Sequence, residues 1–147
     1  LKARCELIND KFIVDVSHNP AAVDNLVNFI KRNFKANIEI HAVLGVMSDK
    51  DAVGMIKSIK GLISYWYTAS PRIDRAMNSS KLASTLRSLT NSKIRDMKEV
   101  DKAVLEAFKN TNESSIVLVL GSFYTVSEAY PIINKLNVGN VKWISYI

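Results

Sequence analysis

An acid, a histidine and an asparagine stand close together at the end of an apolar segment, and these side-chain types can bind a charged ligand. The segment runs from Phe12 to Val16 and is rich in β-branched residues, as buried strands are. Asp15, His18 and Asn19 lie at its end. Pro20 follows at once, and its fixed φ suits the first turn of a helix. Such a turn, beside the positive end of a helix dipole, predicts an anion-binding site.

The same residues also suit a purely structural turn. Asp and Asn are common turn and N-cap residues, and a single histidine is more often structural than catalytic. The local pattern therefore leaves two interpretations open, a ligand-binding turn and a capped helix start.

Two further segments repeat this order of apolar run, polar turn and helix start. Val43–Asp51 reads VLGVMSDKD and carries Lys50, and Val119–Val126 reads VLGSFYTV and carries Ser122. In a parallel sheet the turns that follow the strands lie along one edge. We therefore expect Lys50 and Ser122 to face the same ligand space as the acid and the histidine of the first turn.

Alternating apolar runs and amphipathic segments predict an α/β fold. Strands are expected at Phe12–Val16, Ile38–Leu44, Leu62–Thr68, Ser115–Leu120 and Lys142–Tyr146. Helices are expected at Pro20–Phe34, Lys50–Ile59 with Ser48 or Asp49 as its cap, Ser79–Thr90, Lys98–Lys109 and Ser122–Leu136. Connections of helix length indicate a mostly parallel sheet covered by helices on both faces, which is a three-layer Rossmann-like domain.

Two other features are predicted to be structural. His41 lies inside an apolar strand, where a histidine is most often a satisfied core residue. Tyr65, Trp66 and Tyr67 follow one another directly, whereas a base-stacking platform needs exposed aromatic residues interleaved with basic ones.

The composition is that of one ordinary globular domain over residues 1–147. The chain has 147 residues, of which 48% are hydrophobic and 23% charged, enough for a single core. No apolar run approaches the roughly 20 residues that cross a bilayer, and the start has no signal-peptide core, so we expect a cytoplasmic protein with no membrane partner. Cys5 is the only cysteine, which argues against disulfides and against a cysteine-rich metal site. We expect a monomer with no metal ligands of its own.

The three turns together resemble a known family. DVSHNP, from Asp15 to Pro20, resembles the Asp-x-Ala-His-Asn-Pro signature in the C-terminal domain of folylpolyglutamate synthases and bifunctional dihydrofolate synthases, which belong to the Mur ligase superfamily. Val43–Asp51 resembles that family's Gly-x-x-x-Asp-Lys-Asp loop, and Val119–Val126 its Gly-Ser-Phe-x-Thr-Val turn. The resemblance extends from about Arg4 to the end, although the stretch from Pro71 to Met97 carries no matching motif.

This resemblance implies ATP-dependent amide formation. In the family, ATP phosphorylates a folate or pteroate carboxylate to an acyl phosphate, and the amino group of L-glutamate then displaces phosphate. The implied ligands are ATP with Mg²⁺, L-glutamate, and folate or dihydropteroate. The family's phosphate loop lies in a preceding ATPase domain, which also holds most of the Mg²⁺ contacts.

The resemblance also implies roles for individual residues. Asp15 would accept hydrogen bonds from the ribose, and His18 would act catalytically by donating to an ATP phosphate. Arg4 matches by position an arginine that approaches the ATP phosphates, although Ala3 replaces the family's glycine; the alternative for Arg4 is a solvated side chain. The glutamate contacts would come from Asn19, Lys50 and Ser122.

Nothing in the sequence resembles the Gly-x-x-x-x-Gly-Lys-Ser/Thr phosphate loop, and the first residue is Leu1, not methionine. We therefore expect an excised C-terminal domain that lacks its ATPase domain. Such a fragment should fold but should not form glutamyl amides by itself.

Two other functions stay open as alternatives. A net charge of +6, with many basic residues between Arg72 and Lys98, would suit a nucleic-acid or nucleotide-binding module, but the bases are dispersed and no recognition motif accompanies them. A ligase acting on a peptidoglycan precursor would use the same domain. The histidine of DVSHNP and the Gly-Ser-Phe-x-Thr-Val match favour the folate branch.

Overall fold

The computed structural model describes residues 3–144, and side chains as far as residue 136. Its sheet has six strands in the order β1-β2-β6-β3-β4-β5. The strands are β1 (Glu6–Ile8), β2 (Phe12–Asp15), β3 (Glu39–Leu44), β4 (Tyr65–Ala69), β5 (Lys93–Lys98) and β6 (Ser115–Leu120). Among these six strands, only β1 pairs antiparallel, with β2, and the other pairings are parallel. The predicted mostly parallel sheet is confirmed.

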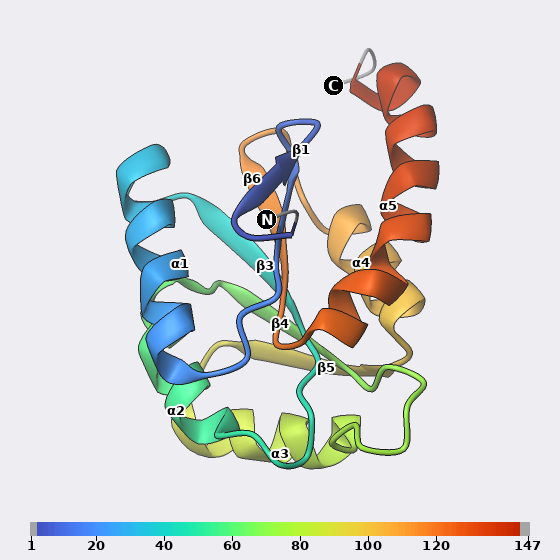
Figure 1. Ribbon diagram of the computed structural model, residues 1–147. Helices are drawn as coiled ribbons and strands as arrows, with labels where there is room; N and C mark the ends of the chain where they lie inside the picture. Colours follow the sequence, from blue (N-terminus) through green and yellow to red (C-terminus); the bar gives the residue numbers. More distant parts are fainter. Residues whose placement is uncertain (1–2, 145–147) are drawn as a thin grey trace.

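Helices cover both faces of this sheet (Figure 1). One face carries α1 (Pro20–Asn33), α2 (Ala52–Ile59) with the short 3₁₀ helix η1 (Lys60–Leu62), and α3 (Ser79–Leu89); the other carries α4 (Val100–Lys109) and α5 (Phe123–Ile144). The predicted three-layer arrangement is therefore confirmed as well. Among the described residues, no helix combines the length and apolarity that crossing a bilayer requires.

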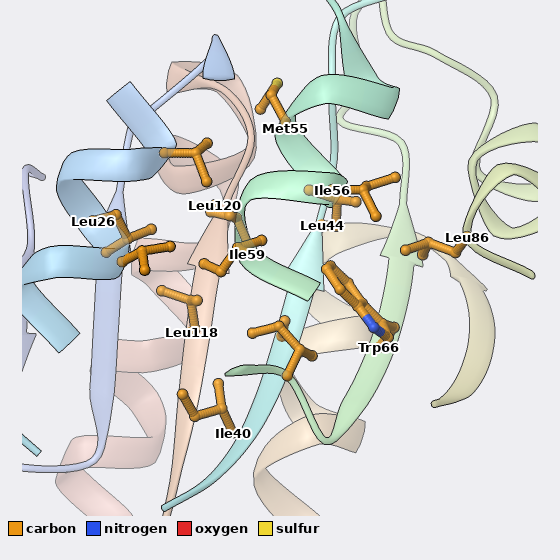
Figure 2. Packing of buried hydrophobic residues seen from close by; sticks show 14 of the residues in the cluster. Leu26, Ile40, Leu44, Met55, Ile56, Ile59, Trp66, Leu86, Leu118 and Leu120 are labelled. Atoms are coloured by element: carbon orange, nitrogen blue, oxygen red, sulfur yellow. The ribbon is translucent and has the colours of Figure 1, made fainter. Parts of the chain in front are cut away.

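Each sheet face has its own apolar core, because side chains alternate along a strand. Figure 2 shows the larger core, in which Trp66, Leu118 and Leu120 of the strands meet Leu26 of α1 and Ile56 of α2. The second core lies under α4 and α5. The central strand β6 is buried along its whole length, as expected for a strand covered on both sides. These cores fix the strand ends from which the polar turns emerge.

Sequence reasoning missed two edge strands. β1 has only three residues, and the turn to β2 uses Asn9 and Asp10, both with φ near 54°, while Lys11 N–H donates to the Ile8 carbonyl at 3.1 Å. Asn and Asp tolerate this left-handed backbone, so the dipeptide was an available turn signal. β5 reads KIRDMK, and its charged residues are typical of a strand at a sheet edge.

The predicted C-terminal strand at Lys142–Tyr146 is wrong for the residues that the structure describes. Residues 142–144 belong to α5, which continues past the predicted end at Leu136 to Ile144; positions 145 and 146 lie outside the described residues. A short apolar run cannot be assigned to strand or helix by periodicity alone.

Candidate functional site

Asp15 ends β2 and is buried, with 3% of its surface exposed. Its Oδ2 accepts from the backbone N–H of Cys5 at 2.8 Å and from Cys5 Sγ at 3.3 Å. Its Oδ1 accepts from the backbone N–H of Ser17 at 2.7 Å and from the Ser17 hydroxyl. An ionised carboxylate offers about four acceptor positions, so the chain's own donors occupy them. A ribose hydroxyl would have to replace one of these donors.

The segment before β1 folds back over the end of β2. Ala3 and Cys5 have φ of 68° and 48°, and the Ala3 carbonyl accepts from Val16 N–H at 2.8 Å. Burial, followed by the hydrogen bond to Asp15 and its charge, raises the pKa of Cys5 to about 12. The thiol therefore stays protonated at neutral pH and donates to Asp15. These contacts hold Arg4 beside the turn between β2 and α1.

His18 and Asn19 form the exposed part of this turn. Nδ1 of His18 lies 3.2 Å from the Val16 carbonyl, a contact that requires a proton on Nδ1. In the neutral ring Nε2 is then an acceptor, and only the imidazolium can also donate from Nε2 to a phosphate oxygen. Asn19 is the N-cap of α1, and its Oδ1 accepts from Ala22 N–H at 2.9 Å, which leaves its NH₂ group available.

These residues line one cleft of about 140 Å³, which brings together Arg4, Asp15, His18 and Asn19. The first turn of α1 contains no acidic residue, so the positive end of its dipole is not neutralised locally. A cleft of this size suits a phosphate or a ribose, not a whole nucleotide. The predicted nucleotide residues are thus neighbours in space.

Lys50 lies on the same edge of the sheet but outside this cleft. The prediction that α2 begins at Lys50 is wrong: the helix begins at Ala52, and its cap is Asp51, which accepts from Gly54 N–H at 2.9 Å, not Ser48 or Asp49. Lys50 stands in the preceding loop, half-buried, with Nζ 4.0 Å from Asp49.

The start of α2 packs against the start of α1. A Cβ on Gly54 would lie 2.8 Å from Pro20 Cγ. The loop that carries Lys50 therefore lies near the turn that carries His18.

Ser122 caps α5 from a buried position, with 2% of its surface exposed. Its Oγ accepts from Thr125 N–H at 3.0 Å and lies 2.8 Å from Thr125 Oγ1. Thr125 in turn donates to the Gly45 carbonyl at 2.9 Å. Since the Thr125 proton goes to Gly45, the Ser122 hydroxyl proton goes to Thr125. The backbone N–H groups at the start of α5 that this cap does not use are thus better placed for an anion than this hydroxyl.

The second and third motifs touch each other at two glycines. Gly121 has φ of +118°, and a Cβ there would lie 2.2 Å from the Gly45 carbonyl oxygen. Gly45 N–H also approaches the Leu120 carbonyl, at 3.3 Å. Only glycine permits this conformation and this approach together at position 121. At Gly45 the reason is space, because a Cβ there would lie 2.6 Å from Thr125 Oγ1.

Sequence reasoning assigned no role to the two aromatic residues within the third motif, Phe123 and Tyr124, nor to Arg75, which contacts Tyr124. Phe123 is 64% exposed and packs edge-on against Tyr124, with ring centroids 5.7 Å apart. Arg75, from the loop before α3, reaches the Tyr124 hydroxyl at 3.4 Å. An adjacent pair of large aromatic residues at a helix start was the available signal. Among the described residues, no group of three or more His, Cys, Asp or Glu could hold a metal ion.

Comparison with known proteins gives a consistent family assignment. The family described as Mur ligase, glutamate ligase domain, matches residues 3–123. The dihydrofolate synthase/folylpolyglutamate synthase of Escherichia coli is 31% identical over 141 residues, covering 95% of this chain and 32% of that protein. The enzyme of the same name from Buchnera aphidicola (subsp. Baizongia pistaciae) is 31% identical over 134 residues, covering 91% and 30%. The chain thus spans about a third of the length of these relatives.

Solved structures support the same family assignment. E. coli FolC in complex with DHPP and ADP superposes with a TM-score of 0.83 at 28% identity, covering 93% of this chain and 32% of that one. A bifunctional folylpolyglutamate synthase/dihydrofolate synthase with Mn, AMPPNP and L-glutamate bound gives 0.80 at 28% identity, covering 91% and 32%. The motif resemblance is confirmed by these matches, and the chain belongs to the Mur ligase family through its glutamate ligase domain.

Proposed function

We propose that this chain is the C-terminal domain of an ATP-dependent ligase that adds L-glutamate to folate. The observation that carries the proposal is the cleft at the start of α1, which gathers Arg4, Asp15, His18 and Asn19. Its support from relatives is specific, since the matched ligases are named for both folylpolyglutamate and dihydrofolate synthesis.

The chemistry has two steps. A carboxylate oxygen of the folate attacks the γ-phosphorus of ATP, and ADP leaves. The neutral amine of glutamate then attacks the acyl carbon, phosphate leaves with the acyl oxygen, and the amine loses its proton. In both steps negative charge develops on phosphate or acyl oxygens, so catalysis rests on positioning and on fixed positive groups.

Arg4 supplies such a charge at the nucleotide, and His18 supplies a ring nitrogen. We propose that His18, held by the Val16 carbonyl, donates from Nε2 to a phosphate oxygen, while the guanidinium of Arg4 adds charge. Asp15 would meet the ribose by exchanging one of its present donors, the Cys5 thiol being the longest contact at 3.3 Å.

Glutamate would bind at the same edge of the sheet, outside the nucleotide cleft. Lys50 and the free amides at the start of α5 suit its two carboxylates, and the Asn19 NH₂ group can donate to one of them. The hydroxyl of Ser122 would act mainly through the cap it provides, because Thr125 already uses it.

The remaining components belong to the rest of the enzyme. We propose that a preceding ATPase domain supplies the phosphate loop and most Mg²⁺ contacts; Mg²⁺ would neutralise the phosphates. A relative's structure carries Mn with AMPPNP, which supports a divalent ion at family level. We further propose a cytoplasmic, monomeric enzyme, whose isolated C-terminal domain is inactive.

The test measures ATP-dependent incorporation of labelled glutamate by the full-length protein. Tetrahydrofolate, dihydropteroate and a UDP-N-acetylmuramoyl precursor are offered separately as acceptors, and the chain of residues 1–147 is assayed alongside. The proposal requires incorporation with tetrahydrofolate; incorporation with dihydropteroate would show the second synthase activity. Activity with the muramoyl precursor alone would assign the chain to the peptidoglycan branch. Turnover by residues 1–147 alone would contradict the proposal that a preceding ATPase domain is required.

A further inference from the structure

A second cleft, of about 170 Å³, lies at the opposite end of the strands from the motif turns. Neighbouring strands place side chains there in register, with His41 of β3 beside Tyr65 of β4, and Tyr65 beside Lys93 of β5. Tyr65 and Lys93 are the first residues of their strands, whereas the motif turns follow the last. The two clefts are therefore separate.

This cleft opens on the face of the sheet that α4 and α5 cover. Tyr67 and Arg95 form the next pair on that face, and Asn110, at the end of α4, also lines the cleft. Trp66 contributes to the lining as well, although its side chain packs in the core of the opposite face, near Leu86 of α3 (Figure 2). The sheet's alternation thus collects aromatic and basic residues on one side.

One wall of the cleft is a rigid stack of rings. His41 stacks on Tyr65 with centroids 4.5 Å apart and planes 15° apart, and lies 5.9 Å from Tyr67. His41, only 1% exposed, bonds Tyr67 Oη through Nδ1 at 2.8 Å and Glu39 through Nε2 at 2.7 Å. Asn110 also donates to Tyr67 Oη, at 3.3 Å.

The wall carries no net charge at neutral pH. Burial lowers the pKa of His41, although the hydrogen bond to Glu39 opposes this effect, so the ring is neutral. Nε2–H then donates to Glu39, and Nδ1 accepts from the Tyr67 hydroxyl. Burial raises the pKa of Tyr67, which keeps that hydroxyl protonated.

The rim of the cleft is positive. Lys93 is exposed, and its ammonium group makes no hydrogen bond or ion pair with any residue of the described part of the chain. Arg95 pairs with Glu106 through Nη1, which leaves its Nη2 and Nε donors unused among the described residues. The two cations, Lys93 and Arg95, are thus balanced by the single carboxylate of Glu106, beside an uncharged aromatic wall.

We infer that this cleft binds a small planar carboxylic acid, with its ring against Tyr65 and its carboxylate between Lys93 and Arg95. Sites for drug-sized ligands usually exceed about 300 Å³, so the volume here favours a single-ring acid over a nucleotide or a peptide. Guanidinium and ammonium groups at the rim supply charge-assisted hydrogen bonds. This inference does not depend on the proposed ligase activity.

The test is a ¹⁵N–¹H NMR titration of the chain with benzoate. We expect a dissociation constant on the order of 1 mM, with shifts concentrated at Tyr65, Lys93, Arg95 and Asn110. Acetate, which has the charge without the ring, and benzyl alcohol, which has the ring without the charge, should each bind about tenfold more weakly. Benzylamine, with the opposite charge, should not bind there.

Two substitutions sharpen the result. Lys93→Gln removes the charge of an exposed side chain and should weaken benzoate binding about tenfold, as for loss of one charge-assisted hydrogen bond. Lys57→Gln, an exposed lysine of α2 on the opposite face, should leave the affinity unchanged. Equal affinity for benzoate and acetate, shifts at other residues, or unchanged binding in Lys93→Gln would each overturn the inference.

Discussion

Two acid and histidine pairs lie at opposite ends of the same sheet, and they are built differently. At the carboxyl end, Asp15 bonds to Cys5 and Ser17 while His18 stays exposed, and among residues 3–144 its ring bonds only to the Val16 carbonyl. At the amino end, Glu39 bonds His41 directly, and that ring is buried with both nitrogens engaged.

This difference follows from position in the topology. His41 lies within β3, so its ring must share the packed face of the sheet and needs partners for both nitrogens. His18 lies three residues beyond the end of β2, where the backbone turns toward α1 and Asp15 bonds to the turn instead of to the ring. The same residue types thus give a stabilising network inside a strand and an exposed ring, open to a ligand, after one.

The largest effect should come from the glycine contact that joins the second and third motifs. Gly121→Ala places a Cβ 2.2 Å from the Gly45 carbonyl at φ of +118°, so it should lower the free energy of unfolding by about 3 kcal/mol or more. Gly61→Ala is the matched control, since nothing lies within 4 Å of its Cβ, and it should change stability by less than about 0.5 kcal/mol. Urea unfolding of both variants measures this; equal losses would show that the contact is not required.

Asp15→Asn tests whether the carboxyl-end acid holds the turn, binds ribose, or does both. The amide cannot accept from both Cys5 and Ser17, so unfolding should become easier by about 1–3 kcal/mol. In the full-length enzyme, ATP and 2′,3′-dideoxy-ATP separate the two roles. If Asp15 binds ribose, the variant should lose the preference for ATP; an unchanged preference would leave Asp15 only the structural role.

The amino-end network should make stability depend on pH. Burial lowers the folded-state pKa of His41 below its ordinary value of 6.5, so the unfolded chain binds the proton more readily. The contribution of the neutral ring is therefore complete above pH 6.5 and declines as pH falls from there toward the lowered pKa, by at most about 1.4 kcal/mol per pH unit. The difference in unfolding free energy between wild type and His41→Gln should shrink from pH 7.5 to pH 5. A constant difference would mean that His41 does not titrate in this way.

The smallest effects should separate the two proposed glutamate contacts. Lys50→Ala should raise the Michaelis constant for glutamate about tenfold in the full-length enzyme, and that for ATP much less. Ser122→Ala should raise it only about twofold, because the backbone amides of α5 remain, but should cost about 1 kcal/mol of stability through the lost cap. If only the Michaelis constant for ATP changed, Lys50 would be assigned to the nucleotide site instead.

Much of this site could be predicted, because it lies in contiguous motifs that follow buried strands. The fold class, the family and the turn at Asp15–Pro20 were all visible in local patterns. Contacts between segments far apart in the sequence could not be predicted from it. The donors from Cys5 reach Asp15 only because left-handed residues fold the N-terminal segment back, and the Arg75 contact with Tyr124 joins two loops far apart in sequence.

The amino-end cleft escaped prediction for a related reason. Tyr65 and Tyr67 lack basic neighbours along their own strand, which suggested a purely structural segment. The bases come from β5, a polar edge strand that the sequence did not reveal, and register alone brings Lys93 and Arg95 beside the rings. Pairing between strands, not composition along one strand, creates this surface.

The most direct test compares His18→Gln with His41→Gln in the same full-length enzyme, measuring unfolding free energy and the rate of glutamate incorporation. His18→Gln should leave stability within about 0.5 kcal/mol of wild type and lower amide formation by about 1–3 kcal/mol in activation free energy. His41→Gln should do the reverse, lowering stability by about 1–3 kcal/mol with the turnover rate unchanged. Wild-type turnover in His18→Gln would contradict the assignment of the carboxyl-end turn to the nucleotide.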